Sequence, residues 1–244
     1  MTPQPDAAAA ERLEAQVAAM KARKAVEKPT PAIVAPVVEP FEFVLVPREG
    51  TVFLADDPER EIREREQRRR EAWNAMVPAI YREPFDFAKV NPEANRDELG
   101  KILGWQYGPR GLYIIGHTGL SKSRALCSMV GDYAIYSGRS VKYLDGVAFA
   151  IGAGAAMGNP ETAERWLKSL CAPDILIIDD FAKRWTPSTE EAAFAVVERR
   201  TAWRKPIMIT NNYDRDEMIA RAHDRNVVEP MLRRLKDYCE IASI

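Results

Sequence analysis

The chain of 244 residues is 46% hydrophobic, 9% aromatic and 29% charged, which is typical of a globular protein with one main domain and excludes a large multidomain enzyme. Its 35 basic and 36 acidic residues give a net charge of −1, so any surface for nucleic acid has to be a local basic patch. Three distant cysteines without a CxxC pair argue against a disulfide framework or a structural zinc site. The chain has no apolar run of about 18 to 20 residues and no secretory signal pattern, which favours a cytoplasmic protein.

The first 70 residues are predicted to form an extension ahead of the folded core. Residues 11–28 are typical of a short helix of mixed charge, and the proline-rich residues 29–47 of a linker. Residues 59–71 read EREIREREQRRRE, with four Glu–Arg pairs spaced four apart and Glu first, which favours a solvated helix. That helix either stays solvated or docks on a partner or on DNA. The predicted division is an extension over 1–70 and a core over 71–244.

Beyond Gly111, short β-rich runs alternate with helical stretches. The predicted strands are 112–115, 141–144, 175–178, 207–210 and 238–242. The predicted helices are 122–136, 162–170, 189–203 and 228–236. This alternation predicts an α/β fold with a five-stranded parallel sheet and helices on both faces.

Two capping-box spacings mark expected helix starts, Ser188 with Glu191 and, more loosely, Asp214 with Glu217. Residues 148–160 are rich in glycine and alanine and are predicted to be a mobile loop.

A phosphate-binding loop is predicted between the first strand and the following helix. Small residues there let the backbone approach an anion, a lysine reaches its terminal phosphates and a hydroxyl binds Mg²⁺. Ser121 stands where the GxxxxGK[ST] pattern has glycine, and its Cβ is expected to cost strain of about 1 kcal/mol. The predicted nucleotide-binding residues are Gly116, His117, Thr118, Gly119, Leu120, Ser121, Lys122 and Ser123.

The apolar run 174–180 ends in two acids, which a parallel sheet delivers to its carboxyl edge. Asp179, together with Ser123, is the predicted Mg²⁺ ligand, acting through water, and Asp180 is predicted to orient or deprotonate the attacking water. Asn211 ends the next strand and is predicted to hold that water or to sense the γ-phosphate. Arg233 and Arg234 lie on a late helix, from which an arginine can reach a neighbouring subunit's phosphate.

Together these motifs resemble the DnaC/IstB-like AAA+ ATPases over about residues 69–244. The resemblance rests on the Trp105–Gly111 run, the phosphate loop, the Ile-Ile-Asp-Asp run with Lys183 after it, Glu198–Thr201, Ile209–Asn211 and Arg233–Leu235. It implies an AAA+ core with little or no C-terminal lid, ATP and Mg²⁺ as cofactors, and self-association into an oligomer. It also implies that Arg234 is the trans-acting finger, with Arg233 the near alternative, and that Ile80 and Tyr81 bracket the adenine.

The partners that the resemblance implies are a replicative helicase, held by the N-terminal region, and single-stranded DNA, with Arg139, Lys142 and Lys183 as candidate contacts. The leading hypothesis is therefore an ATP-dependent helicase loader. A transposition helper ATPase that binds duplex DNA, and a non-hydrolysing adaptor disabled by Ser121, stay open as alternatives. An unrelated P-loop kinase is disfavoured, because Asn211 and the late arginines match AAA+ proteins better.

Overall fold

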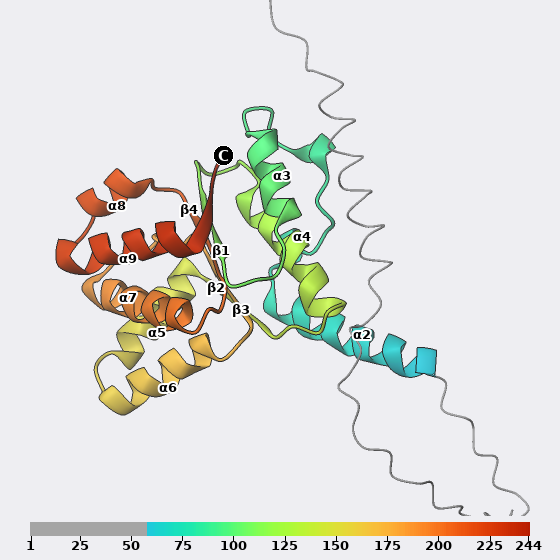
Figure 1. Ribbon diagram of the computed structural model, residues 1–244, viewed down its shortest axis with the longest axis horizontal. Helices are drawn as coiled ribbons and strands as arrows, with labels where there is room; N and C mark the ends of the chain where they lie inside the picture. Colours follow the sequence, from blue (N-terminus) through green and yellow to red (C-terminus); the bar gives the residue numbers. More distant parts are fainter. Residues whose placement is uncertain (1–57) are drawn as a thin grey trace, which may run out of the picture. The chain divides into compact units, whose positions relative to one another are not determined.

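The computed structural model describes residues 58–244, which contain a five-stranded, all-parallel sheet (Figure 1). Its strands lie in the order β2-β3-β4-β1-β5. Their bounds are β1 Gly111–Ile115, β2 Val141–Asp145, β3 Ile175–Asp179, β4 Ile207–Asn211 and β5 Cys239–Ser243. The predicted α/β class and the positions of all five strands are confirmed.

Helices cover both faces of the sheet, because alternate strand residues point to opposite sides and both sides are apolar. Leu112 and Ile114 pack into one cluster with α2, α3 and α4, and Tyr113 between them packs into a second cluster with α5 to α9. Figure 1 shows these two layers on either side of the strands. The helices are α2 Pro58–Met76, α3 Arg96–Gly104, α4 Lys122–Ile135, α5 Gly146–Ala156, α6 Pro160–Cys171, α7 Pro187–Ala202, α8 Arg215–Ala220 and α9 Arg225–Tyr238, with the short 3-10 turns η1 Ala79–Tyr81 and η2 Phe87–Lys89.

The four predicted core helices correspond to α4, α6, α7 and α9, whereas the loop predicted over 148–160 is wrong. Most of that segment is helix α5, which Asp145 caps by accepting a hydrogen bond of 2.7 Å from the Ala148 amide. A Cβ on Gly152 would lie 2.7 Å from the Trp166 indole nitrogen of α6. The small residues of α5 therefore let two helices approach closely, and their abundance does not mark a loop.

The helix caps confirm one of the two predicted boxes. Asp214 and Glu217 form a reciprocal capping box at the start of α8. Helix α7 begins two residues before the expected start, with Pro187 in its first turn and Thr186 as its cap. Ser188 therefore lies inside the helix, and the box predicted there with Glu191 is wrong.

The predicted charged helix is confirmed as the first part of α2, in which Arg63 pairs with Glu59 at 3.2 Å and Arg68 with Glu64 at 4.0 Å. The helix continues past the expected boundary at residue 70, and the compact unit that holds the sheet begins at Glu64. The predictions for 11–28 and 29–47 lie outside the described residues. Within residues 58–244, every helix is too short or too polar to cross a lipid bilayer.

Candidate functional site

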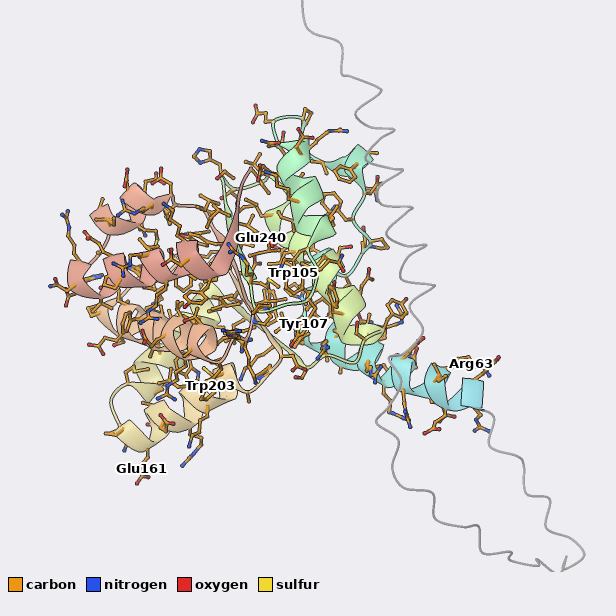
Figure 2. The ribbon with its side chains drawn as sticks, in the orientation of Figure 1. Arg63, Trp105, Tyr107, Glu161, Trp203 and Glu240 are labelled. Atoms are coloured by element: carbon orange, nitrogen blue, oxygen red, sulfur yellow. The ribbon has the colours of Figure 1, made fainter. Side chains whose placement is uncertain are left out.

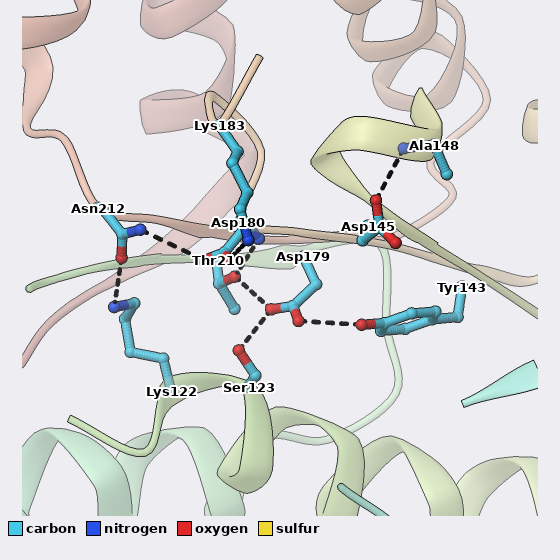
Figure 3. Close-up of polar contacts among 10 residues, drawn as sticks. All are labelled: Lys122, Ser123, Tyr143, Asp145, Ala148, Asp179, Asp180, Lys183, Thr210 and Asn212. Atoms are coloured by element: carbon cyan, nitrogen blue, oxygen red, sulfur yellow. Dashed lines mark hydrogen bonds and ion pairs between the residues drawn. The ribbon is translucent and has the colours of Figure 1, made fainter. Parts of the chain in front are cut away.

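The candidate site lies where the carboxyl ends of β1, β3 and β4 meet the first turn of α4 (Figure 3). Parallel strands all end at this edge of the sheet, so segments far apart in sequence deliver their polar residues to one place. The loop from Gly116 to Ser121 joins β1 to α4, which aims its amino terminus at the site. This is the loop that the sequence predicts to bind phosphate.

Two close constraints fix the backbone of this loop. A Cβ on Gly116 would lie 2.4 Å from the Ile244 carbonyl oxygen, so no larger residue fits there. Gly119 has a φ of 90°, a region that side chains rarely adopt. Both glycines are therefore needed for the shape of the loop.

Ser121, where the motif has glycine, adopts the left-handed conformation with φ 65° and ψ 15°. A serine there costs about 1 kcal/mol relative to glycine. Its side chain makes no capping hydrogen bond to α4. The loop thus keeps a glycine-like geometry with a residue that is strained in it.

Lys122 is buried and points back across the loop. Its Nζ donates to the carbonyl oxygens of Gly116 and His117, both at 2.7 Å, and to Oδ1 of Asn212 at 2.9 Å. Burial lowers the pKa of Lys122, and the nearby charges of Asp180 and Asp179 oppose that shift. An ammonium group held by neutral oxygens at a helix amino terminus is poised to bind an anion.

Asp179 is buried and accepts hydrogen bonds from three hydroxyl groups. Its Oδ1 accepts from Ser123 at 2.6 Å and from Thr210 at 2.5 Å, and its Oδ2 accepts from Tyr143 at 3.0 Å (Figure 3). Ser123 and Asp179 were predicted to share a Mg²⁺ ion, and the fold brings their oxygens together from 56 residues apart. Carboxylate and hydroxyl oxygens are the hard donors that Mg²⁺ takes, so this pair fits the ion.

Asp180 follows in a left-handed conformation with φ 53°. Its amide donates to Thr210 Oγ1 at 2.8 Å, while its carboxylate lies 3.3 Å from Lys183 Nζ and accepts from Asn212 Nδ2 at 3.3 Å. This turn directs the side chain of Asp180 out of the strand and toward Lys122. Asn212 therefore links the lysine and the second acid.

Asn212, the residue after Asn211, is the amide that contacts both Lys122 and Asp180. Asn211 is the last residue of β4, and its Nδ2 donates to the Tyr113 hydroxyl at 3.0 Å inside the second cluster. Burial raises the pKa of Tyr113 to about 12, and the hydrogen bond from Asn211 opposes that shift. Successive residues of a strand point to opposite faces, so the next residue along reaches the phosphate loop.

Two further residues of the site, Thr210 and Tyr143, are not among those predicted from the sequence. Thr210 lay inside a predicted strand without a role, and Tyr143 lies on the edge strand β2, far from any motif. Burial raises the pKa of Tyr143, and so does the charge of Asp179. The pairing register of β2, β3 and β4 brings these two hydroxyl groups to Asp179. Because that pairing joins segments far apart in the chain, no local sequence pattern predicts the contacts.

Comparisons with solved structures support a shared fold. A candidate primosome component from Streptococcus pyogenes serotype M3 matches with a TM-score of 0.53 and 19% identity, covering 69% of this chain and 89% of that one. DnaI matches with a TM-score of 0.53 and 14% identity, covering 69% and 94%. The initiator DnaA bound to AMPPCP and single-stranded DNA matches with a TM-score of 0.50 and 16% identity, covering 64% of this chain and 48% of DnaA. Family models and curated protein sequences give no match.

The chain shares its fold with these solved structures. This confirms the fold that the resemblance implies. The sequence identities are all below 20%, so the fold is the property that these proteins share with the chain. The chain spans about half the length of the DnaA structure.

Within this fold, the two candidate finger residues lie on α9. Arg234 pairs with Glu198 of α7 at 2.8 Å and is half-buried, whereas Arg233 beside it is exposed. Ile80 and Tyr81 lie in η1, and Ile80 is 60% exposed. Burial raises the pKa of Tyr81, with a smaller contribution from Asp179, so its hydroxyl lies toward the acids.

Proposed function

We propose that the protein is an AAA+ ATPase that binds Mg·ATP and delivers a replicative helicase to single-stranded DNA. The observation that carries this proposal is the chain of contacts from Lys122 through Asn212 to Asp180, beside the Ser123–Asp179 pair. Such a site offers a cation for the phosphates, oxygens for Mg²⁺ and a carboxylate for water at one sheet edge. Solved structures of the same fold include DnaI and DnaA, and DnaA was solved with AMPPCP and single-stranded DNA.

The proposed roles follow the geometry. Residues 116–123 surround the phosphates with backbone N–H groups, and Lys122 leaves its carbonyl partners to bind the terminal phosphates. Ser123 and Asp179 hold Mg²⁺, which neutralises charge that develops on the phosphates. Asp180 orients or deprotonates the attacking water, and Asn212, in place of Asn211, holds that water against it.

The proposed assembly is an oligomer in which Arg234 reaches the γ-phosphate of a neighbouring subunit. Its ion pair with Glu198 is half-exposed, so it is expected to be weak and easily exchanged for a phosphate. Arg233 is the alternative finger because its side chain is exposed on the same helix.

Light scattering after size-exclusion chromatography tests the assembly, with the protein alone, with Mg·ATP, and with a hexameric replicative helicase from the same organism. We expect Mg·ATP to increase the oligomer mass, the protein to elute with the helicase, and Arg234→Ala to lose the increase in mass. The helicase-loader proposal is abandoned if the protein neither elutes with the helicase nor changes mass with Mg·ATP.

The adjacent asparagines give a matched pair of variants. Asn212→Ala is expected to lower the ATP turnover rate by about 10- to 100-fold, since it removes the amide between Lys122 and Asp180, with little change in unfolding temperature. Asn211→Ala is expected to lower the free energy of unfolding by about 1–3 kcal/mol, because the buried Tyr113 hydroxyl loses its partner. Phosphate release and thermal melts measure both effects. A turnover loss confined to Asn211→Ala would return the catalytic role to that residue.

One observation favours a second candidate, the non-hydrolysing adaptor. Ser121 is strained, and the loop's own carbonyl oxygens occupy the Lys122 ammonium group, and both features oppose nucleotide binding. An adaptor would elute with the helicase equally well with and without nucleotide. A transposition helper would instead prefer duplex DNA and assemble on it.

A further inference from the structure

A band of cations and aromatic rings lies at the amino ends of the strands, opposite the carboxyl ends that form the candidate site. Parallel strands all begin at this edge, and the helices that return between them end there, so loops from distant parts of the chain meet. We call this the basic-aromatic band. It consists of Arg69, Arg70, Tyr107, Arg110, Tyr136, Arg139, Trp203, Arg204 and Lys205.

The contacts within the band form a connected series. Arg70 donates to the Tyr136 hydroxyl at 3.1 Å, and Arg69 donates to the Ile135 carbonyl at the end of α4 at 3.4 Å. The guanidinium of Arg139 lies 4.0 Å from the centre of the Tyr107 ring. The side chains from α2, from the end of α4 and from the segment before β1 therefore share one surface.

The series continues toward the end of α7. The hydrogen bond from the Ser140 amide lowers the pKa of Asp174, and the charges of Arg139 and Lys205 lower it further. Lys205 donates to the carbonyl oxygens of Cys171 and Ala172, at 3.2 and 2.5 Å, where α6 ends. Trp203 and Arg204 come directly before Lys205, and Figure 2 shows Tyr107 beside α4 and Trp203 at the end of α7.

Part of this arrangement serves the fold, because a cation near the end of a helix satisfies its last carbonyl oxygens. Arg69 and Lys205 do so for α4 and α6, and Arg110 donates to the Cys239 carbonyl after α9 at 3.0 Å. That role does not explain Trp203, which is 57% exposed, or Tyr136, which is 56% exposed. Exposed aromatic rings between cations need another explanation.

Cations outnumber carboxylates among the residues of the band. Asp174 is the carboxylate in its middle, and it already accepts from the Ser140 amide and hydroxyl, both at 2.9 Å. Asp237 and Glu240 border the band at the β5 end. Within the band itself, six cations stand beside one carboxylate that is already hydrogen-bonded, and the acids Glu66, Glu71 and Asp132 lie outside it on α2 and α4.

We propose that the basic-aromatic band binds single-stranded nucleic acid, with its cations on the phosphates and with bases stacked on Trp203 and Tyr136. Cations interleaved with open aromatic rings suit unpaired bases, which have free faces to stack, and not a duplex, whose bases are already stacked. The proposal deepens the proposed function and rests on its single-stranded DNA partner. It places the strand on the edge away from the nucleotide, so both bind at once.

Fluorescence anisotropy with a labelled 20-nucleotide oligo(dT) and the full chain tests this surface. The variant Arg139→Ser with Arg204→Ser is expected to raise Kd about tenfold or more and to reduce the slope of log affinity against log salt by about 1.4, or 0.7 per cation. Arg221→Ser is the matched control, because Arg221 also lies 4.0 Å over a tyrosine ring, that of Tyr213, but directly after α8 and outside the band. Its Kd is expected to stay within about twofold of the wild type.

Trp203→Ala tests stacking separately. We expect it to raise Kd about 5- to 100-fold and to abolish the quenching of tryptophan fluorescence by oligo(dT). Ile151→Ala is its control, because Ile151 is equally exposed, at 57%, and lies on α5. Thermal melts of all variants exclude loss of folding as the cause.

Each other result overturns the proposal. Equal affinities for the band variants and their controls would place the nucleic acid elsewhere, a preference for a 20-base-pair duplex would exclude stacking, and binding of polyglutamate in place of oligo(dT) would indicate an acidic protein partner. Lys122→Ala separates the two proposals. We expect it to lose nucleotide use while it keeps oligo(dT) binding, so failure of the ATPase site and failure of the band give different results.

Discussion

Lys122→Ala is expected to lower ATP turnover by about 100-fold or more, because it removes the buried ammonium group that we propose binds the terminal phosphates. The same Nζ holds the loop through Gly116 and His117 and reaches Asn212, so its removal also frees the amide beside Asp180. Phosphate release at saturating Mg·ATP measures the turnover, and titration with a fluorescent ATP analogue measures the affinity. Wild-type turnover that persists in Lys122→Ala would exclude this loop as the catalytic site.

Ser121→Gly is the companion variant in that experiment. Glycine relieves the left-handed strain at φ 65° that the loop already carries, so we expect the free energy of unfolding to rise by about 1 kcal/mol. Turnover in the wild type would mean that the loop tolerates serine. Turnover that appears only in Ser121→Gly would identify a disabled site and favour the adaptor.

The largest expected effect on stability comes from Arg200, whose side chain is fully buried. Its guanidinium donates to the carbonyl oxygens of Leu170, Pro173, Asp174 and Pro206, at 2.7–3.1 Å. Burial lowers the pKa of Arg200 to about 10, which still leaves it charged at neutral pH. It therefore ties the loops that precede β3 and β4 to α7 with four charge-assisted hydrogen bonds.

Arg200→Leu is expected to lower the free energy of unfolding by about 4 kcal/mol or more, because it leaves several carbonyl oxygens buried without a donor. Denaturant unfolding followed by circular dichroism measures the loss. Arg199→Leu is the matched control, since the adjacent Arg199 makes a partly exposed ion pair with Glu164 at 2.6 Å and is expected to cost less than about 1 kcal/mol. Equal losses in the two variants would contradict the role given to Arg200.

The sequence predicts the strands, the phosphate loop and the two acids well because each has a local signal. An apolar run that ends in acid, or a glycine loop between a strand and a helix, carries its structural context with it. Asn211 and Asn212 differ only in which face of β4 they reach, and a strand end is uncertain by more than one residue. Tyr143 and Arg200 act through partners about 30 residues away, which no local pattern identifies.

Each strand of the sheet is five residues long. At about 3.3 Å per residue, the sheet is about 16 Å from one edge to the other. In the two proposals, the nucleotide would lie at the carboxyl ends of the strands and the nucleic acid at their amino ends, so the length of the sheet would separate the two sites. Coupling between these two proposed ligands would pass through β3, β4 and the helices packed on them, because a shift of these elements at one end of the strands moves the residues at the other end.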